Sequence, residues 1–432
     1  MKRIVVALAL LLATLVATQG ARAEEARPSV VAGYDPLVGA FIRTPDGRWE
    51  LNPYAMIQIT HTTAGRSEHV ESTGFALHAA KLILHGHIVD PSVTYHFQMN
   101  LGDGKVAAED VYLHWAPTRT FALLVGQYEV AYNRQHITLE AYQELLERSI
   151  VDARFTLQRD IGAVAYLSDS AHRFEATGGI WNGARQNAPN DDSSYLVTLR
   201  LAYNPFGPIA FREADLEDSP RPKLSLAAAG AYNPERTIPP VAPATTSTTW
   251  NDTTQGVLES TLRWRGLSLT SELHARRYDD GKARWDTGGF AQAGYFVLPR
   301  TIQVVARGAH VIGTTVRDTD TVVEETAGIN YYIRGHRLKL QAEGSRLETR
   351  RIHGGWRARA RSWSSSCDEE VDVNHTTPND GPTTRDPVLA AIERIERRLA
   401  RIESAVAELS SARAAAPPMV ATVVDSLDDA AD

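Results

Sequence analysis

The chain contains 432 residues, of which 43% are hydrophobic and 22% charged, and its formal net charge at pH 7 is −7. A net-acidic chain does not attract nucleic acid or other anions through its overall field, so any anion preference must come from local basic clusters. The single cysteine, Cys367, cannot form an internal disulfide. It is either a free thiol, which we favour, or an intermolecular link.

The first 23 residues have the pattern of a secretory signal peptide. Met-Lys-Arg precedes an apolar run from Ile4 to Ala17, and Ala21-Arg22-Ala23 forms a small-residue cleavage site. We therefore expect export, with a signal peptide at 1–23 and an N-terminal periplasmic segment at 24–48. The leader carries three basic residues and no acid, so its removal takes the formal charge from −7 to −7 − 3 = −10.

Strict alternation of apolar and polar residues dominates the middle of the chain. Ser92 to Leu101 reads Ser-Val-Thr-Tyr-His-Phe-Gln-Met-Asn-Leu. A strand points successive side chains to opposite faces, so this segment has one apolar and one polar face. Repeated to about residue 350 behind an export signal, the pattern is typical of an outer-membrane β-barrel, in which the apolar face meets lipid and the polar face lines water.

The alternation predicts a transmembrane antiparallel β-barrel of about 16 strands over residues 49–366, which makes the fold class all-β. The expected strands are Trp49–Ala64, Phe75–Val89, Ser92–Leu101, Glu109–Trp115, Phe121–Val130, Ile161–Leu167, Phe174–Trp181, Ser194–Tyr203, Leu224–Tyr232, Gly256–Trp264, Leu267–Tyr278, Thr287–Leu298, Thr301–Ala309, Val323–Ile333, Arg337–Ser345 and Trp356–Ser364. The last of these lacks the apolar character of the others.

The connections between these strands alternate in length. Those after even-numbered strands are mostly tight, and those after odd-numbered strands are mostly longer and polar, as at 65–74 and 310–322. Such sorting is expected when both chain ends of the barrel lie in the periplasm. Two connections depart from it, the short one at 102–104 and the long one at 204–223.

The longest connection between consecutive strands, Ala131 to Asp160, contains an expected helical stretch from Thr138 to Ile150. Its apolar residues have nothing to pack against except the barrel interior, so we expect an inward-folded constriction loop. This loop would carry four arginines into the narrowest part of the pore: Arg134, Arg148, Arg154 and Arg159.

Beyond the barrel we expect a polar linker at 367–386, a coiled coil at 387–410 and a disordered acidic tail at 411–432. Aliphatic residues occupy the a and d positions of three heptads from Val388 to Leu409, with isoleucine at two d positions. This pattern favours a trimer. The alternative is a lone amphipathic helix that lies on a partner, since three heptads are marginal.

Several motifs resemble the phosphate-selective porin O and P family. They are Gly126-Gln127-Tyr128-Glu129-Val130-Ala131-Tyr132, Glu147-Arg148-Ser149, Gln158-Arg159-Asp160-Ile161-Gly162 and Asp215-Leu216-Glu217-Asp218-Ser219-Pro220-Arg221-Pro222. The resemblance covers roughly 49–345. It implies a homotrimeric sixteen-stranded porin in the bacterial outer membrane, with a passage for phosphate or other small anions lined by arginine and lysine. The weak closing strand and the coiled coil after the barrel depart from the family.

Alternation also places basic residues on the face toward the water-filled lumen. These are Lys81, Arg263, Arg265, Arg276, Arg307, Arg334, Arg337 and Lys339. Guanidinium groups bind phosphate oxygens bidentately, and a series of weak sites lets an anion enter and leave. Acids such as Asp110 and Glu259 share this face, so ion-paired lumen residues are the alternative interpretation. Likewise, Arg148 and Arg159 could hold the loop to the wall instead of contacting solute.

Three functions follow from these patterns: an anion-preferring channel, a general porin of the same architecture, and a barrel anchor whose coiled coil tethers a periplasmic partner. No G-x-S-x-G or H-E-x-x-H motif is present, so we expect neither an enzyme nor a cofactor. His85 and His87 share a strand face, but a metal site needs at least one more ligand, and a solvated pair is favoured.

Overall fold

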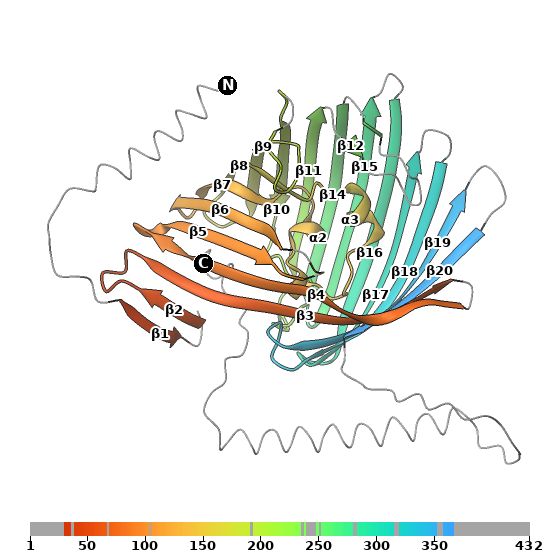
Figure 1. Cartoon of the computed structure of the whole chain (residues 1–432), viewed down its shortest axis with the longest axis horizontal. Coiled ribbons are helices and arrows are strands. Elements are labelled where there is room, and N and C mark those ends of the chain that lie inside the picture. The colour runs from red at the N-terminus through yellow and green to blue at the C-terminus, as the bar shows by residue number, and fades with distance from the viewer. Residues whose placement is uncertain are drawn as a thin grey trace, which may run out of the picture.

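The computed structural model describes residues 30–35, 39–66, 69–102, 104, 106–190, 193–234, 237–238, 248–249, 252–279, 283–314, 319–351 and 357–366. Within these residues the chain is almost entirely β-structure (Figure 1). No helix in this part of the chain is long and apolar enough to cross a membrane.

The strands are β1 (Val31–Asp35), β2 (Gly39–Arg43), β3 (Glu50–Arg66), β4 (His69–Ile88), β5 (Asp90–Asn100), β6 (Ala107–Thr118), β7 (Phe121–Glu129), β8 (Arg159–Ser168), β9 (Phe174–Trp181), β10 (Leu196–Tyr203), β11 (Lys223–Pro234), β12 (Thr237–Ile238), β13 (Thr248–Thr249), β14 (Asp252–Trp264), β15 (Leu267–Asp279), β16 (Ala283–Leu298), β17 (Ile302–Thr314), β18 (Thr319–Tyr332), β19 (Lys339–Arg351) and β20 (Arg357–Ser366). Between β7 and β8 lie α2 (Arg134–Ile137), a 3-10 turn η1 (Glu140–Tyr142) and α3 (Ile150–Phe155). Each of the expected strands has a counterpart.

The main sheet has 18 antiparallel strands, and from β3 to β20 each strand pairs with the next, apart from β12 and β13, which form a separate two-stranded sheet. The β4–β5 register joins Lys81 to Asn100 and His87 to Thr94. β20 pairs with β19 and also with β3, where Ser365 lies opposite His61. The weakest strand of the sequence pattern therefore does pair on both of its sides.

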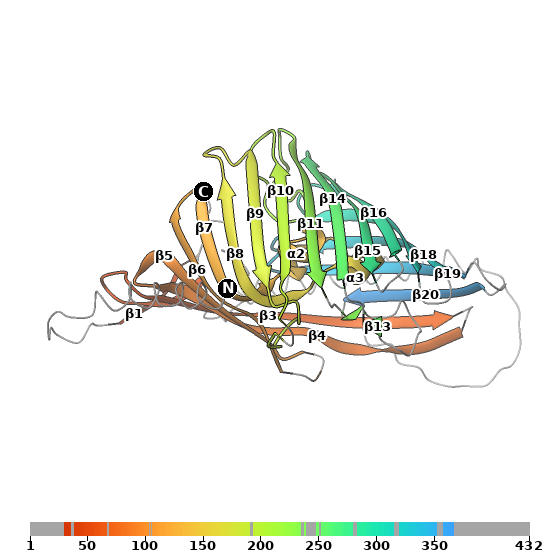
Figure 2. The ribbon, with the colours of Figure 1, turned by 90° about the horizontal axis from the view of Figure 1, so that it is seen from above.

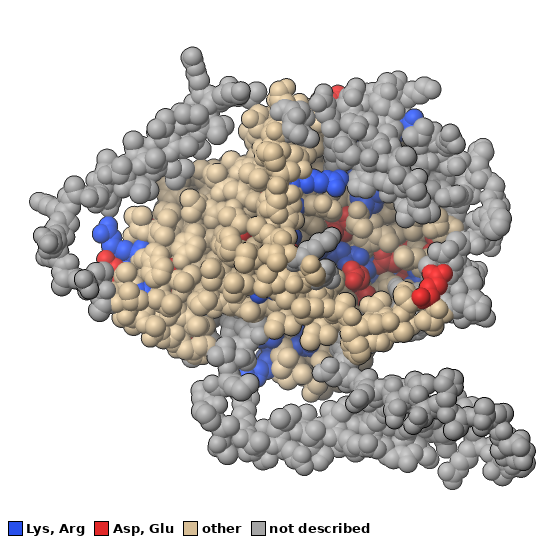
Figure 3. Space-filling model, in the orientation of Figure 1, with Lys and Arg blue, Asp and Glu red and all other residues tan. Residues whose placement is uncertain are grey.

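The two faces of the sheet have opposite character, as the alternation predicted. Along β10, Val197, Leu199 and Leu201 are 47%, 53% and 52% exposed, whereas Thr198 and Arg200 are 3% and 4% exposed. We call the face of Thr198 and Arg200 the inner face and the opposite one the outer face. In Figure 3 a broad tan surface is nearly free of charge, and many of the visible charges gather in the hollow on the right, with others at the left and lower edges. An apolar surface of this extent requires an apolar solvent.

Three features of the strand pattern differ from expectation. β1 and β2 form a hairpin within the expected N-terminal segment, and β2 adds to the start of β3. The stretches expected as loops at 65–74 and 310–322 are largely strand, because β3, β4, β17 and β18 extend into them. Polar side chains continue the pairing there, as in the 3.0 Å contact between the hydroxyls of Thr63 and Thr73. Alternation of apolar residues stops before the backbone ladder does.

The signal peptide at 1–23, the linker with Cys367, the coiled coil at 387–410 and the tail at 411–432 lie outside the described residues. The expectations for these segments remain predictions.

Two connections fold onto the inner face of the sheet. We call residues 130–158, between β7 and β8, the constriction loop, and residues 204–222, between β10 and β11, the second inward segment. Viewed from above in Figure 2, α2 and α3 of the constriction loop lie within the curve of the strands. The long link after β10, which departed from the sorting of loop lengths, is therefore a structured part of the interior.

Candidate functional site

Apolar packing anchors the constriction loop at both of its ends. Tyr132 is fully buried in a cluster with Trp181, Leu196 and Val257 from three strands. At the other end, Phe155 of α3 packs with Phe290 of β16 and with Ala309 and Val311 of β17. Burying each such large side chain contributes about 1.5–3 kcal/mol. The inward fold expected from the loop's apolar residues is thus present.

The prediction of a helix from Thr138 to Ile150 is wrong, because only η1 and the first residue of α3 fall in this range. The backbone between them is held by carboxylates of the surrounding structure. Leu146 N donates to Glu343 (2.7 Å), and Ile150 N donates to Glu324 (2.8 Å). Because the sheet provides acceptors for these N–H groups, the segment does not need the internal hydrogen bonds of a helix.

The same arrangement holds the beginning of the constriction loop. Arg134 N donates to Glu259 (3.1 Å), and Gln135 N donates to Glu272 (2.7 Å). Together with Glu343 and Glu324, these carboxylates come from β14, β15, β18 and β19. These four carboxylates therefore hold the backbone of the loop, and we call them the docking rail: Glu259, Glu272, Glu324 and Glu343.

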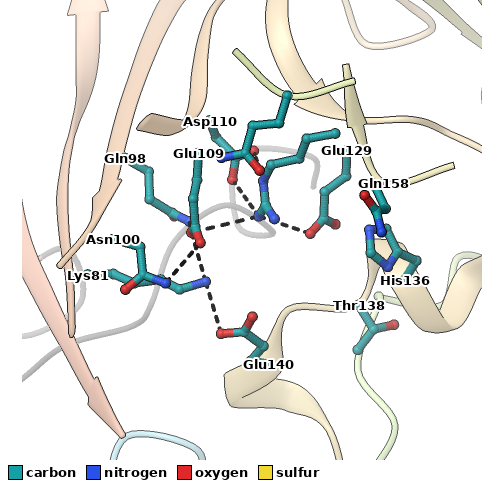
Figure 4. A network of polar contacts seen from close by, with 12 residues as sticks. Lys81, Gln98, Asn100, Glu109, Asp110, Glu129, His136, Thr138, Glu140 and Gln158 are labelled. Atoms are coloured by element: carbon teal, nitrogen blue, oxygen red, sulfur yellow. Dashed lines mark hydrogen bonds and ion pairs between the residues drawn. The ribbon is translucent and has the colours of Figure 1, made fainter. Parts of the chain in front are cut away.

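A dense ion-pair network also fixes the loop to the inner face of β4, β6, β7 and β8 (Figure 4). The Nζ atom of Lys81 lies 2.9 Å from carboxylate oxygens of both Glu109 and Glu140. Arg159 donates to Asp110 at 2.8 Å and lies 3.0 Å from Glu129. Two of the predicted anion-binding residues thus already have carboxylate partners.

Three further predicted residues make similar contacts. Arg154 and Arg276 share the carboxylate of Asp286, and Arg276 is 3.0 Å from it. Arg307 donates to Glu324 at 2.6 Å and to the carbonyl of Glu147 at 2.9 Å. These guanidinium groups connect the wall to the loop, as the ion-pairing alternative proposed.

Arg148 differs from these residues. Its side chain donates to the carbonyls of His136 and Thr138 at 3.2 and 3.1 Å. Its ion-pair contacts, to Glu140 and Asp152, are both at 3.9 Å, and its side chain is 20% exposed. The side chains of Lys81, Arg154, Arg159, Arg276 and Arg307 are only 1–12% exposed. Arg148 therefore keeps more of its charge available to solvent.

Arg134 and Arg263, the last two predicted residues, converge on the second inward segment. Their Nη2 atoms donate to the carbonyl of Ala210 at 2.7 and 3.0 Å. The guanidinium of Arg134 also stacks 4.5 Å from the centre of the Phe211 ring. The guanidinium of Arg200, which the sequence analysis did not single out, lies 5.5 Å from the centre of the same ring. It also donates to Glu259 at 2.7 Å.

Two acidic groups of the constriction loop, Glu140 and Glu144, have displaced pKa values. Burial opposes ionisation of Glu140, but Lys81 and Arg148 outweigh it and lower the pKa to about 2. The opposite holds for Glu144, whose pKa is raised to about 7 by burial and then by the neighbouring Glu213. Glu213 accepts from Glu144 N at 2.8 Å and from Gln292 at 2.8 Å. The two segments thus meet at a pair of buried carboxyl groups.

The structure places all eight predicted residues on the inner face or on the loop docked against it. Sequence reasoning missed Arg200 and Glu213. The alternation that placed Arg263 on the inner face also places Arg200 there, whereas no local signal identifies Glu213. His85 packs against Tyr54 at 5.3 Å between ring centres. Within the described residues no group of three or more His, Cys, Asp or Glu could hold a metal ion.

An antiparallel sheet with an apolar outer face, a polar inner face and a long connection docked inside defines an outer-membrane porin. The sequence model of the family described as phosphate-selective porin O and P matches residues 62–208 of this chain. The family resemblance of the motifs is thereby confirmed over those residues, and the chain is placed in the bacterial outer membrane.

Similar solved structures show the same fold at low sequence identity. The anion-selective porin from Comamonas acidovorans has a TM-score of 0.50 and 11% identity, over 73% of this chain and 98% of that chain. The outer membrane channel DcaP of Acinetobacter baumannii has a TM-score of 0.50 and 9% identity, over 75% and 98%. OmpT of Vibrio cholerae in a trimer form has a TM-score of 0.50 and 9% identity, over 73% of this chain and 98% of that chain. No curated protein matches the sequence.

Proposed function

We propose that the protein is a water-filled outer-membrane channel for passive diffusion of small anions, with phosphate or related oxyanions as its solutes. The pairing of β20 with β3 supports closure of the sheet into a barrel. A barrel of about 16 strands is too wide to be filled by wall side chains alone, so the constriction loop sets the width of the passage.

The proposed anion preference is supported above all by the exposure of Arg148 and by the distance of its guanidinium from carboxylates. Its guanidinium stands on the constriction loop, is 20% exposed, and is 3.9 Å from Glu140 and Asp152. The more deeply buried arginines are neutralised by close carboxylates and contribute less to the field in the passage. Selectivity therefore rests on a few solvent-accessible guanidinium groups and not on the total number of basic residues.

Reversal potentials in a KCl gradient across a planar bilayer test this proposal. We expect anion preference in the native channel, a clear loss of it in Arg148→Gln, and retention in Arg148→Lys, which keeps the charge. Glu147→Gln is the matched control: it removes an exposed charge of opposite sign at the adjacent position, so it should increase anion preference. An unchanged reversal potential in Arg148→Gln would contradict the role of this residue.

A general porin is the second candidate, because carboxylates line much of the inner face. Glu259, Glu272, Glu324 and Glu343 all lie there. The loop N–H groups carry no net charge, so their contacts with Glu272 and Glu343 do not neutralise these carboxylates, and negative charge in the lumen favours cations. Cation-selective reversal potentials in the native channel would favour this candidate.

The protein is further proposed to form homotrimers in outer-membrane lipid. The outer apolar face and the trimer form of the similar OmpT structure support this assembly. A native mass of three chains in detergent is expected, and a monomer in both the full chain and a chain ending at 386 would oppose it. Loss of trimers only in the shortened chain would assign assembly to the expected coiled coil.

A further inference from the structure

A basic cavity lies where the second inward segment meets the turn between β18 and β19. Its volume is about 200 Å³. Arg212 and Glu217 of the segment, Arg263 of β14, and Arg334, His336 and Arg337 of the turn line it, with Tyr142 of the constriction loop. Pockets for drug-sized ligands measure about 300–1,000 Å³. The cavity therefore suits a small ion.

The lining of this cavity carries an excess of positive charge. Four guanidinium groups face one carboxylate, Glu217, and that carboxylate forms an ion pair with Lys223 outside the lining. In the ion-pair network of Figure 4, by contrast, the single guanidinium of Arg159 contacts two acids, Asp110 and Glu129. Clustered guanidinium groups match the geometry of oxyanions, because each presents parallel N–H donors to two oxygens.

His336 adds an acceptor to this ring of donors. Its Nδ1 atom lies 3.1 Å from the carbonyl of Ala141 and donates to it. Its Nε2 atom is buried without a hydrogen-bond partner. Contacts with Tyr142 and Tyr332, at 4.9 and 5.6 Å between ring centres, fix the ring. Burial, followed by Lys339 and Arg212, lowers the pKa of His336 well below its usual value. The neutral ring therefore presents a lone pair at Nε2.

We propose that this cavity binds a small oxyanion that still carries a proton, such as hydrogen phosphate. Arg212, Arg263, Arg334 and Arg337 donate to its oxygens, and Nε2 of His336 accepts its hydroxyl. A fully ionised oxyanion such as sulfate has no hydroxyl to donate, so the cavity discriminates against it. The inference deepens the proposed channel function, on which it rests, and assigns oxyanion recognition to residues away from Arg148.

Titration calorimetry of the full chain in detergent, with inorganic phosphate and with sulfate, tests the proposal. We expect phosphate to bind more tightly than sulfate. Arg334→Gln with Arg337→Gln should weaken phosphate binding about tenfold. His336→Phe, which removes the acceptor, should abolish the preference for phosphate over sulfate. Arg265→Gln is the matched control, because this exposed arginine in the turn after β14 is not part of the lining and should leave both affinities unchanged.

Equal affinities for phosphate and sulfate in the native protein, or no effect of the double substitution, would overturn the assignment. If the double variant does not fold, Arg334→Gln alone repeats the measurement, because Arg334 is exposed and its replacement does not disturb buried packing. Phosphate binding by a cation-selective channel would contradict only the proposed function. Anion selectivity without phosphate binding would contradict only this cavity.

Discussion

At the scale of single residues, charge in this interior serves attachment more than recognition. Lys81 and Arg159 each contact at least two carboxylates, and Arg307 contacts both a carboxylate and a loop carbonyl. Alternation correctly indicated which residues point inward. It could not indicate which inward residues are neutralised, because their partners come from segments distant in sequence.

Replacing Arg159 by Gln should destabilise the protein by about 3 kcal/mol or more, because it leaves Asp110 and Glu129 buried without their cation. The temperature at which the folded form is lost in semi-native electrophoresis measures the effect. Arg346→Gln is the control: its partner Glu325 is 67% exposed, and such surface pairs contribute about 0–1 kcal/mol. Equal temperature shifts in the two variants would show that the buried network contributes no more to stability than the surface ion pair does.

Glu144 predicts a dependence of stability on pH. Its folded-state pKa of about 7 lies above the ordinary 4.5, so the folded state favours the protonated carboxyl. This contribution is complete below about pH 4.5 and is lost as the pH rises through about 7. The same electrophoretic temperature should therefore fall between about pH 5 and pH 8, and Glu144→Gln should flatten that fall. Glu147→Gln, at an exposed position, should keep the native slope; flattening there instead would exclude Glu144 as the cause.

At the scale of elements, strands were more predictable than the connections between them. The period of two survives any tertiary context that keeps one face in lipid, so β9 has the expected bounds and β15 nearly so. The prediction of a helix from Thr138 to Ile150 failed because carboxylates of β18, β19 and the second inward segment accept hydrogen bonds from its N–H groups and replace the internal bonds of a helix. The second inward segment carries the motif from Asp215 to Pro222 and is unusually long, but neither feature places it on the inner face. β1 and β2 are too short for a period to be recognised.

Replacing residues 134–155 by a short Gly-Ser linker should raise single-channel conductance severalfold and shift selectivity toward cations. Removal of the loop widens the passage and exposes Glu259, Glu272, Glu324 and Glu343 to solvent. Glutamine at these four positions in the shortened chain should remove the cation shift and keep the high conductance. A shortened chain with native conductance would show that the constriction lies elsewhere.

At the scale of the whole molecule, the exposed apolar outer face determines where the protein can fold. Leu199, near the middle of β10, is 53% exposed, and Tyr203, at its end, is 42% exposed. On a barrel in lipid, the cost of a charge on this face depends on its depth, from about 2–4 kcal/mol at the midplane to about 0–1 kcal/mol near the interface.

Leu199→Arg should thus lower the free energy of unfolding in lipid vesicles by about 2–4 kcal/mol, and Tyr203→Arg by about 0–1 kcal/mol. Denaturant titration followed by tryptophan fluorescence measures both. Similar values for the two variants would show that no gradient of polarity crosses the outer face, and the membrane assignment would then lose its physical basis.

The docking rail for the constriction loop binds main-chain N–H groups, which every residue except proline supplies. An exposed side chain of the loop, such as that of Glu147, can consequently be exchanged without detaching the backbone around it. Attachment and solute choice are thus encoded by different atoms of the same segment. One scaffold of this kind can be relined for a new nutrient by a few substitutions, with its architecture left intact.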